Sequence, residues 1–286
     1  MILERLGIIS DEVSADFKEA IQWISEQQLK HIEVRMVDGV NVMELTDEQL
    51  DAVMGEVEDK GLFISAISSP VFKCALDPER PVASGDTFGQ EEENVASHFE
   101  KLERAFVIAK RLKTNRIRIF SFWREKNPAQ FQEEIITHLR KAAKRAEEEG
   151  IELVLENEGS CNGGLAQEVG ELVRAVDSPA LKALWDPGNE ACRGKTAYPD
   201  GYEHVKDILT HVHIKDAYVN QSGKARCVPV STGQVAYREQ FQALINDGYK
   251  GLFTIETHFT PEGGTKMDGS RMTLDNLRLL LKSMDK

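Results

Sequence analysis

Short apolar runs alternate with amphipathic stretches along the whole chain. Each apolar run is rich in Val, Ile, Leu or Phe, and most are flanked by helical patterns. This arrangement is typical of strands in a parallel sheet that helices cover. We therefore predict eight strands, at residues 6–10, 31–35, 62–68, 116–123, 151–157, 181–185, 211–215 and 251–257.

The segments between these strands carry helix signals. Thr46 and Gln49 form a capping box at the start of one helix, and Gly61 ends it. The segment 198–207 has a weaker helical pattern. Residues 69–90 and 216–234 are predicted to be irregular, and a loop as long as the first is usually functional or mobile. The predicted helices are residues 16–28, 46–61, 91–112, 127–150, 165–176, 198–207, 237–247 and 270–284.

Eight strands alternating with eight helices predict an α/β protein with a (β/α)8 TIM barrel fold. The chain has 286 residues and no linker rich in Pro, Gly or Ser, so we expect one domain over residues 1–286. An open, doubly wound sheet is the alternative. Such a sheet normally has a glycine-rich phosphate loop after its first strand, and residues 8–16 contain no glycine.

Charge and composition narrow the possible partners. The formal net charge is −13, which repels nucleic acids and anionic membranes. No apolar run reaches the length of a membrane span, and the first ten residues are too short and too charged for a signal peptide. The four cysteines include no C-x-x-C pair, so free thiols are expected. We predict a cytoplasmic protein that acts on a small molecule.

Four consecutive predicted strands end in a carboxylate or an imidazole: Glu156, Asp186, His213 and Glu256. The carboxyl ends of barrel strands converge on one mouth, so these side chains should meet. Three carboxylates in one site cannot all stay ionised without compensation. One imidazole and three carboxylates suit a single divalent ion, namely Mn²⁺, Mg²⁺, Co²⁺ or Zn²⁺.

Each of these residues also has a structural interpretation. Glu156 or Glu158 alone fits a solvated turn, and Asp186 before Pro-Gly fits the start of a turn. His211 and His213 point to the same face of their strand, so one of them fits a hydrogen-bonded core histidine. The coincidence of all these residues at strand ends favours a site.

Further candidates for substrate binding flank the four strand ends. Lys215 points to the same side as His213, and Arg35 ends the second strand, where an ion pair with Glu33 is the alternative. Trp123 ends the fourth strand, where its ring would stack on a sugar or pack at the barrel mouth. Glu158 is a candidate for contact with the substrate or with the metal ligands.

Four motifs resemble the xylose-isomerase-like barrel superfamily, in particular its sugar phosphate isomerase/epimerase branch. They are LVLEN at 153–157, WDPGN at 185–189, HVHIKD at 211–216 and TIETH at 254–258. The resemblance covers essentially the whole chain. It implies a metal held by Glu156, Asp186, His213 and Glu256, with the two glutamates as paired acid and base.

The sequence departs from the family pattern at two positions. Asn189 stands where family members often have a histidine near the substrate oxygens, so it is expected to bind substrate without shuttling a proton. Ser231-Thr232-Gly233 replaces the usual Gly-x-Gly after the seventh strand. Both departures concern the substrate rather than the metal.

The ligand set predicts chemistry on a hydroxy-ketone. A divalent ion acidifies the proton next to the carbonyl, and one glutamate removes that proton while the other returns it. The prediction is a metal-dependent isomerase or 3-epimerase of a small sugar-like compound. An inosose-type dehydratase with the same site is the alternative. A non-catalytic carbohydrate-binding barrel and an abasic-site endonuclease are further alternatives, but the endonuclease needs more histidines and a basic face. By analogy with the family, a homo-oligomer is an option.

Overall fold

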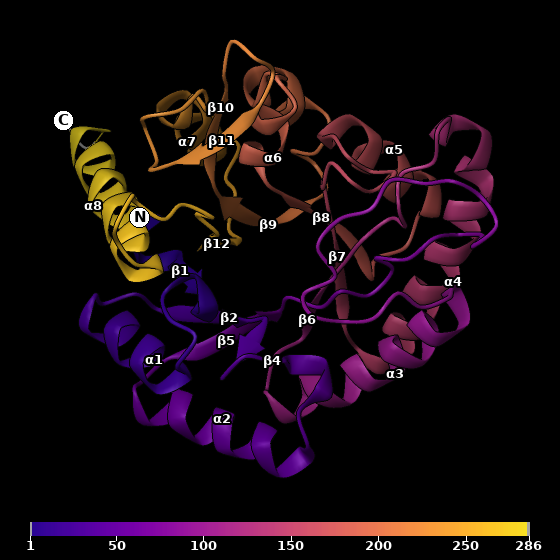
Figure 1. The fold of residues 1–286 in the computed structure, drawn as a ribbon, viewed down its shortest axis with the longest axis horizontal. Helices are drawn as coiled ribbons and strands as arrows, with labels where there is room; N and C mark the ends of the chain where they lie inside the picture. Colours follow the sequence, from indigo (N-terminus) through magenta and orange to yellow (C-terminus); the bar gives the residue numbers. More distant parts are fainter. Residues whose placement is uncertain (1, 285–286) are drawn as a thin grey trace.

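The computed structural model describes residues 2–284 and closes eight parallel strands into a barrel (Figure 1). Around the barrel the strands follow the order β1-β12-β9-β8-β7-β6-β5-β2. This confirms the predicted (β/α)8 barrel. The single domain over residues 1–286 stays a prediction, and residues 1, 285 and 286 lie outside the described part. The strands are β1 (Leu6–Ile9), β2 (His31–Val34), β5 (Phe63–Ile67), β6 (Arg116–Ile119), β7 (Glu152–Glu156), β8 (Leu181–Trp185), β9 (Leu209–Ile214) and β12 (Leu252–Ile255).

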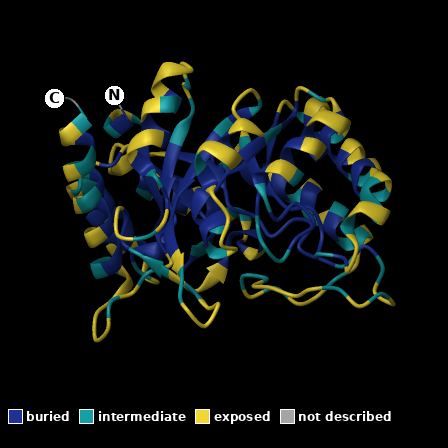
Figure 2. Cartoon of the chain, turned by 90° about the horizontal axis from the view of Figure 1, so that it is seen from above, coloured by how far each residue is buried: buried dark blue, intermediate teal, exposed yellow. Residues whose placement is uncertain are grey.

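Helices surround the strands, and Figure 2 shows their exposed outer surfaces around a buried centre. The predicted capping box at Thr46 is present, and Gly150 ends its helix at φ 69°. Among residues 2–284, no helix has the length and apolar composition that crossing a membrane requires. The helices are α1 (Phe17–Glu26), α2 (Asp47–Asp59), α3 (Val95–Arg111), α4 (Gln132–Glu149), α5 (Ala166–Val176), α6 (Pro187–Cys192), α7 (Tyr237–Asn246) and α8 (Lys266–Met284), with short turns η1 (Ile2–Arg5), η2 (Ser10–Glu12), η3 (Val42–Glu44), η4 (Pro128–Phe131) and η5 (Ala197–Gly201).

The predicted helix at 198–207 is present only in part, as the π-helical turn η5 (Ala197–Gly201) and one further turn in which Lys206 N donates to Tyr202 O at 3.0 Å. Tyr198 has the extended dihedrals φ −127° and ψ 132°, because the following Pro199 disfavours the helical region. The helix that follows β8 is instead α6, a short helix that Asp186 caps by accepting a hydrogen bond from Asn189 N.

The segment 216–234, predicted to be irregular, contains a hairpin of β10 (Asp216–Val219) and β11 (Ala225–Val228). Its turn includes Gly223 at φ 79°, a left-handed position that favours glycine. A second small hairpin joins β3 (Met36–Val37) and β4 (Val40–Asn41). Both hairpins follow barrel strands at the carboxyl end, where the predicted site lies.

The predicted fourth strand also ends earlier than expected, at Ile119. Beyond it, residues 120–123 run beside residues 71–74 of the long loop after β5. Phe120 N donates to Val71 O at 3.0 Å, and Trp123 N donates to Cys74 O at 2.9 Å. The start of the long loop is therefore fixed to the barrel by backbone hydrogen bonds.

The interior of the barrel is polar. In β2, the apolar Ile32 and Val34 belong to the core beneath the helices, whereas His31 and Glu33 alternate with them and face inward. Glu33 is hydrogen-bonded to His211 of β9, a strand that is not its neighbour in the barrel. Such a contact is possible only across the barrel interior. Inward-facing residues nearer the carboxyl ends of the strands, such as Arg118 and Glu156, place charged side chains at the barrel mouth.

Gly7 of β1 is required by this packing. A Cβ at this position would lie 2.3 Å from Nδ1 of His31, far inside van der Waals contact. The imidazole therefore occupies the space that a side chain on β1 would need, and it fills the interior near the amino-terminal end of the strands.

Candidate active site

The four predicted metal ligands meet at the carboxyl end of the barrel. Glu156 ends β7, Asp186 follows β8, His213 lies in β9, and Glu256 follows β12. All four side chains are buried, and one ligand atom from each lies within 4.8 Å of those of the others. The structure thus brings together the four residues that the sequence singled out.

Glu33 fixes the orientation of the His213 ring. Nε2 of His213 lies 3.1 Å from Glu33 Oε2, so Nδ1 points the other way, to 3.5 Å from Glu156 Oε1 and 3.4 Å from Glu256 Oε2. Ser68 Oγ donates to Glu33 at 2.6 Å, and His211 contacts the same carboxylate. A carboxylate behind a histidine is the usual support of a metal-binding imidazole. His211 is the hydrogen-bonded core histidine of the pair.

Three cations balance the carboxylates. Arg118 Nη1 lies 3.1 Å from Glu156 Oε2 and 3.4 Å from Glu256 Oε1. Lys215 Nζ lies 2.6 Å from Asp186 Oδ2 and 2.9 Å from Glu256 Oε2. Arg35 Nη1 lies 2.9 Å from Glu256 Oε1.

Arg35 does not pair with Glu33, which was the structural alternative. Its other partners are Asp11 at 2.9 Å and Glu12 at 2.7 Å. It therefore holds the two acids that follow β1 next to the carboxylate that follows β12. Arg35 acts at the edge of the ligand cluster rather than within the cavity.

These contacts decide the charge states. Burial opposes ionisation of Glu256, but Lys215 and the neighbouring histidines outweigh it and hold its pKa well below the usual range. Burial also opposes the charge of Lys215, and Asp186 and Glu256 raise its pKa well above normal. For Asp186, burial and the neighbouring glutamates raise the pKa despite Lys215. A further positive charge near Asp186 would therefore favour its ionised form.

The residues fit a divalent ion. His213 Nδ1 has no hydrogen-bond partner, and Glu156 Oε2 and Asp186 Oδ2 have only the ion pairs with Arg118 and Lys215. Buried polar atoms without hydrogen bonds are uncommon unless something else binds them. These atoms belong to three of the four clustered residues, and carboxylate with imidazole suits Mn²⁺, Mg²⁺, Co²⁺ or Zn²⁺.

A cavity of about 140 Å³ opens beside the cluster. Glu156, Glu256 and Lys215 line it from one side, together with the predicted substrate-binding residues Glu158 and Asn189. Nδ2 of Asn189 donates to Asn157 O at 2.8 Å and approaches Glu156 Oε1 at 3.4 Å. Its amide therefore lies beside a carboxylate of the cluster, and its contact with substrate stays a prediction.

Two predicted substrate-binding residues lie outside this cavity. Arg35 lines an adjoining cavity of about 460 Å³, which shares Asp86, Phe88 and His258 with the first. Trp123 faces a different pocket, and its Nε1 donates to Glu92 at 3.0 Å. Phe120 lines the cavity in its place. A role of Trp123 in direct substrate binding stays a prediction without support from this geometry.

Sequence reasoning missed several residues of the site. Arg118 lies in the alternating run R-I-R-I-F, which looks like a strand with one solvated face. In a closed barrel that face is the interior, so the alternation itself was the available signal. Lys73, Phe88 and His258 also line the cavity, but they come from loops with no comparable pattern.

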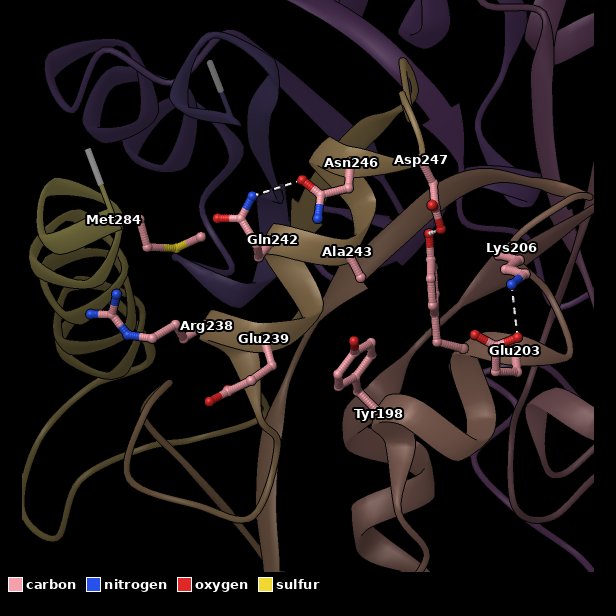
Figure 3. Close-up of a pocket in the computed structure, with 11 residues that line it drawn as sticks. Tyr198, Glu203, Lys206, Arg238, Glu239, Gln242, Ala243, Asn246, Asp247 and Met284 are labelled. Atoms are coloured by element: carbon pink, nitrogen blue, oxygen red, sulfur yellow. Dashed lines mark hydrogen bonds and ion pairs between the residues drawn. The ribbon is translucent and has the colours of Figure 1, made fainter. Parts of the chain in front are cut away.

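The protein has a larger groove on its outer surface, of about 570 Å³, between the segment 198–206 and α7 (Figure 3). Its side chains interact with one another: Lys206 binds Glu203 at 2.7 Å, and Gln242 donates to Asn246 at 2.9 Å. Within residues 2–284, two groups of side chains are spaced to hold a metal ion, and neither lines this groove. They are Glu156, Asp186, His213 and Glu256, and Glu33, His211 and His213. The candidate site is therefore the cluster at the barrel mouth.

Comparison with known proteins agrees with this architecture. A sequence model described as "Xylose isomerase-like TIM barrel" matches residues 21–280. An inosose dehydratase of Geobacillus thermodenitrificans (strain NG80-2) is 24% identical over 154 residues. That match covers 48% of this chain and 51% of the relative, about half the length of each.

Solved structures extend the likeness over nearly the whole chain. The apo 3-keto-D-glucoside 4-epimerase from E. coli has a TM-score of 0.72 and 15% identity, and the match covers 97% of this chain and 99% of that one. A xylose isomerase-like TIM barrel protein from Mycobacterium smegmatis, in complex with magnesium, has a TM-score of 0.68 and 18% identity, with 94% and 89% covered. At such identities the likeness shows a shared fold.

Proposed function

Because the chain belongs to the xylose isomerase-like TIM barrel family, we propose that it is a divalent-metal-dependent isomerase or 3-epimerase of a small sugar-like hydroxy-ketone. One observation carries this proposal. Glu156 and Glu256 each lie within 3.5 Å of His213 Nδ1, with Asp186 in the same cluster, and both glutamates also line the cavity. A pair of carboxylates that reaches both an ion and a substrate suits proton transfer.

Glu156, Asp186, His213 and Glu256 would hold the ion. When bound, the ion would polarise the carbonyl of the substrate and acidify the neighbouring C–H. Glu33 keeps Nδ1 of His213 directed at the cluster, as the hydrogen bond to Nε2 requires. The choice among Mn²⁺, Mg²⁺, Co²⁺ and Zn²⁺ is left to experiment.

The two glutamates differ in their surroundings, which suggests different tasks. Glu256 is held by Arg35 and Lys215, so its carboxylate is fixed in place. Glu156 contacts Arg118 and the amide of Asn189. In our proposal one glutamate removes the proton next to the carbonyl and the other returns one. Lys215 and Asn189 donate hydrogen bonds to substrate oxygens.

The place of proton return defines the reaction. Return to the same carbon from the opposite face is epimerisation, and return to the neighbouring carbon is isomerisation. Loss of a hydroxide after the first step is dehydration. We keep an inosose-type dehydratase as the second candidate, because the curated relative carries that name. If the protein is instead a non-catalytic carbohydrate-binding barrel, it should bind its ligand without exchanging a carbon-bound proton for solvent.

Deuterium wash-in tests the proposal. The protein with added Mn²⁺ is incubated in D2O with ketoses, ketose phosphates and inososes. We expect deuterium next to the carbonyl of at least one compound, and its loss in Glu156→Gln and after chelation. A chain that binds one metal but exchanges no compound would support the binding alternative. A chain that binds no divalent metal would contradict the mechanism.

The remaining assignments follow from charge and analogy. With a formal net charge of −13, nucleic acids are not expected partners. A cytoplasmic location and a homo-oligomer stay predictions. Size-exclusion chromatography with light scattering would determine the oligomeric state.

A further inference from the structure

Lys73 is a buried cation in the substrate cavity that the proposed reaction does not use. It belongs to the segment 71–74, which is hydrogen-bonded to residues 120–123 at the barrel mouth. Phe72 packs into the core against Phe122, whereas Lys73 lines the cavity. Only 4% of Lys73 is exposed to solvent.

The Lys73 ammonium lies among aromatic rings. Nζ is 4.3 Å from the ring centre of Phe88, 4.5 Å from that of Phe120 and 5.8 Å from that of Trp123. It donates one hydrogen bond, to Asp86 O at 2.9 Å. Within residues 2–284, no carboxylate lies within ion-pair distance of it.

The other cations of the site are paired. Arg35, Arg118 and Lys215 each contact at least two carboxylates. A buried charge is normally paired, because leaving water is costly. The π faces offset part of that cost, but aromatic rings carry no net charge. An ammonium has three donors, and Lys73 uses one of them on the protein.

We propose that Lys73 binds an oxyanion of the substrate, a carboxylate or a phosphate, and that the substrates are acidic hydroxy-ketones. This inference rests on the proposed function, because it concerns the same cavity. The oxyanion supplies a counter-charge in direct contact, which no carboxylate of residues 2–284 provides although Asp86 and Glu158 line the same cavity, and it accepts the two free N–H bonds of the ammonium.

The geometry separates this position from the reacting carboxylates. The guanidinium of Arg118 lies 5.0 Å from the ring centre of Phe88 and 4.9 Å from that of Phe120, the same two rings that Lys73 contacts. Arg118 is paired with Glu156, so the aromatic pair adjoins both the reaction centre and Lys73. A small substrate with its carbonyl at the glutamates would reach Lys73 with its other end.

Paired substrates test the proposal. D-fructose and D-tagatose are the neutral compounds, D-fructuronate and D-tagaturonate carry a carboxylate, and the two 6-phosphates carry a phosphate. Calorimetric dissociation constants are measured at a fixed Mn²⁺ concentration, and deuterium exchange is measured with the same compounds. We expect wild type to bind at least one acidic compound about tenfold or more tighter than its neutral parent.

Variants of Lys73 assign that preference to the ammonium. We expect Lys73→Met to weaken binding of the acidic compound about 10- to 100-fold, and much more than binding of the neutral parent, because a charged hydrogen bond is lost. Lys73→Arg keeps the charge and should retain much of the preference. The matched control is Lys101→Met: Lys101 holds the same loop through Gln90 and Glu93, so its loss should affect both compounds equally.

The outcomes separate the two proposals. A wild-type protein that prefers no acidic compound, or a Lys73→Met variant that weakens both classes equally, would overturn the role of Lys73. Exchange into neutral ketoses alone would leave the proposed enzyme standing without the oxyanion site. Selective, Lys73-dependent binding without any exchange would support the site and contradict the proposed reaction. The uronates and the phosphates distinguish the two oxyanions.

Discussion

The two halves of the barrel end in opposite charges. The carboxyl-terminal half, β7 to β12, supplies the acids and the imidazole of the ligand cluster. The amino-terminal half, with β2, β5 and β6, supplies cations: Arg35 after β2, Lys73 after β5 and Arg118 in β6. The division has exceptions in both halves: Lys215 is a cation of the second half that pairs with Asp186 and Glu256, and the first half also carries the buried acids Asp11, Glu12 and Glu33.

Under the two proposals made above, the two halves of the mouth would bind different ligands. The acidic half suits a divalent ion, and Arg35 and Arg118 reach across from the other half to hold its carboxylates. Lys73 is the cation of the first half with no acid to hold. Changes in the acidic half should therefore affect the chemistry most, whereas changes in the basic half should affect stability and substrate preference.

Glu156→Gln tests the acidic half and has the largest expected effect. It removes the proposed proton acceptor and metal ligand, so the rate of deuterium exchange should fall about 10³-fold or more. Exchange rates and metal titration are the measurements. The matched control is Glu203→Gln, which makes the same change in the outer groove and should leave the rate unaltered. Equal rates in wild type and Glu156→Gln would remove Glu156 from the mechanism.

Arg118→Met tests the basic half. Arg118 and Glu156 have side-chain exposures of 1% and 2%, so loss of the guanidinium leaves buried carboxylates uncompensated. We expect a loss of about 3 kcal/mol in the free energy of unfolding, measured in urea without metal. Saturating Mn²⁺ should recover part of it, because the ion would supply the missing charge.

The neighbouring Arg116→Met is the control. Arg116 forms its pair with Glu152 at 2.7 Å, but the side chains are 16% and 23% exposed. Such a pair contributes about 1 kcal/mol or less. An equal loss in both variants, or no effect of Mn²⁺ on Arg118→Met, would contradict the idea that the first half balances the charge of the second.

The two halves also differ in how far the sequence revealed them. An acid directly after an apolar strand is a local signal, so Glu156, Asp186 and Glu256 were visible without a structure. Arg118 lies inside a strand, and its role appears only when the sheet closes and its polar face becomes an interior. Asp11 and Glu12 find Arg35 across neighbouring strands, which no local spacing encodes.

The loops were the least predictable part. Lys73 lies in a stretch whose only sequence signal was its unusual length. Its burial depends on backbone pairing with residues 120–123, a contact between distant segments. Trp123 shows the converse: its position near a strand end suggested stacking on a sugar, but Trp123 lines a different pocket and Phe120 lines the cavity.

Glu33→Gln tests a contact between the two halves inside the barrel. Glu33 belongs to the first half and orients His213 of the second. A glutamine keeps one acceptor but not the charge that fixes both imidazoles, so metal affinity should fall about 10- to 100-fold. The dissociation constant of the metal is measured by isothermal titration calorimetry. Ser65→Ala, which removes a hydroxyl bonded to Ile32 O of the same strand, is the control. Unchanged affinity in Glu33→Gln would show that His213 needs no carboxylate behind it.

The smallest effect concerns the loop that carries Lys73. His98 Nδ1 accepts a hydrogen bond from Phe72 N at 2.8 Å, and burial lowers the pKa of His98 to about 4. Between pH 6.5 and 4 the unfolded chain binds the proton and the folded chain does not, so this contribution is lost as the pH falls. We expect His98 to account for about 1 to 2 kcal/mol of the stability lost between pH 7 and pH 5. His98→Gln, which keeps an acceptor, should flatten the urea-unfolding profile by that amount, whereas His204→Gln at an exposed histidine should not. If the unfolding free energies of wild type and His98→Gln fall equally with pH, the neutral imidazole of His98 does not stabilise this loop.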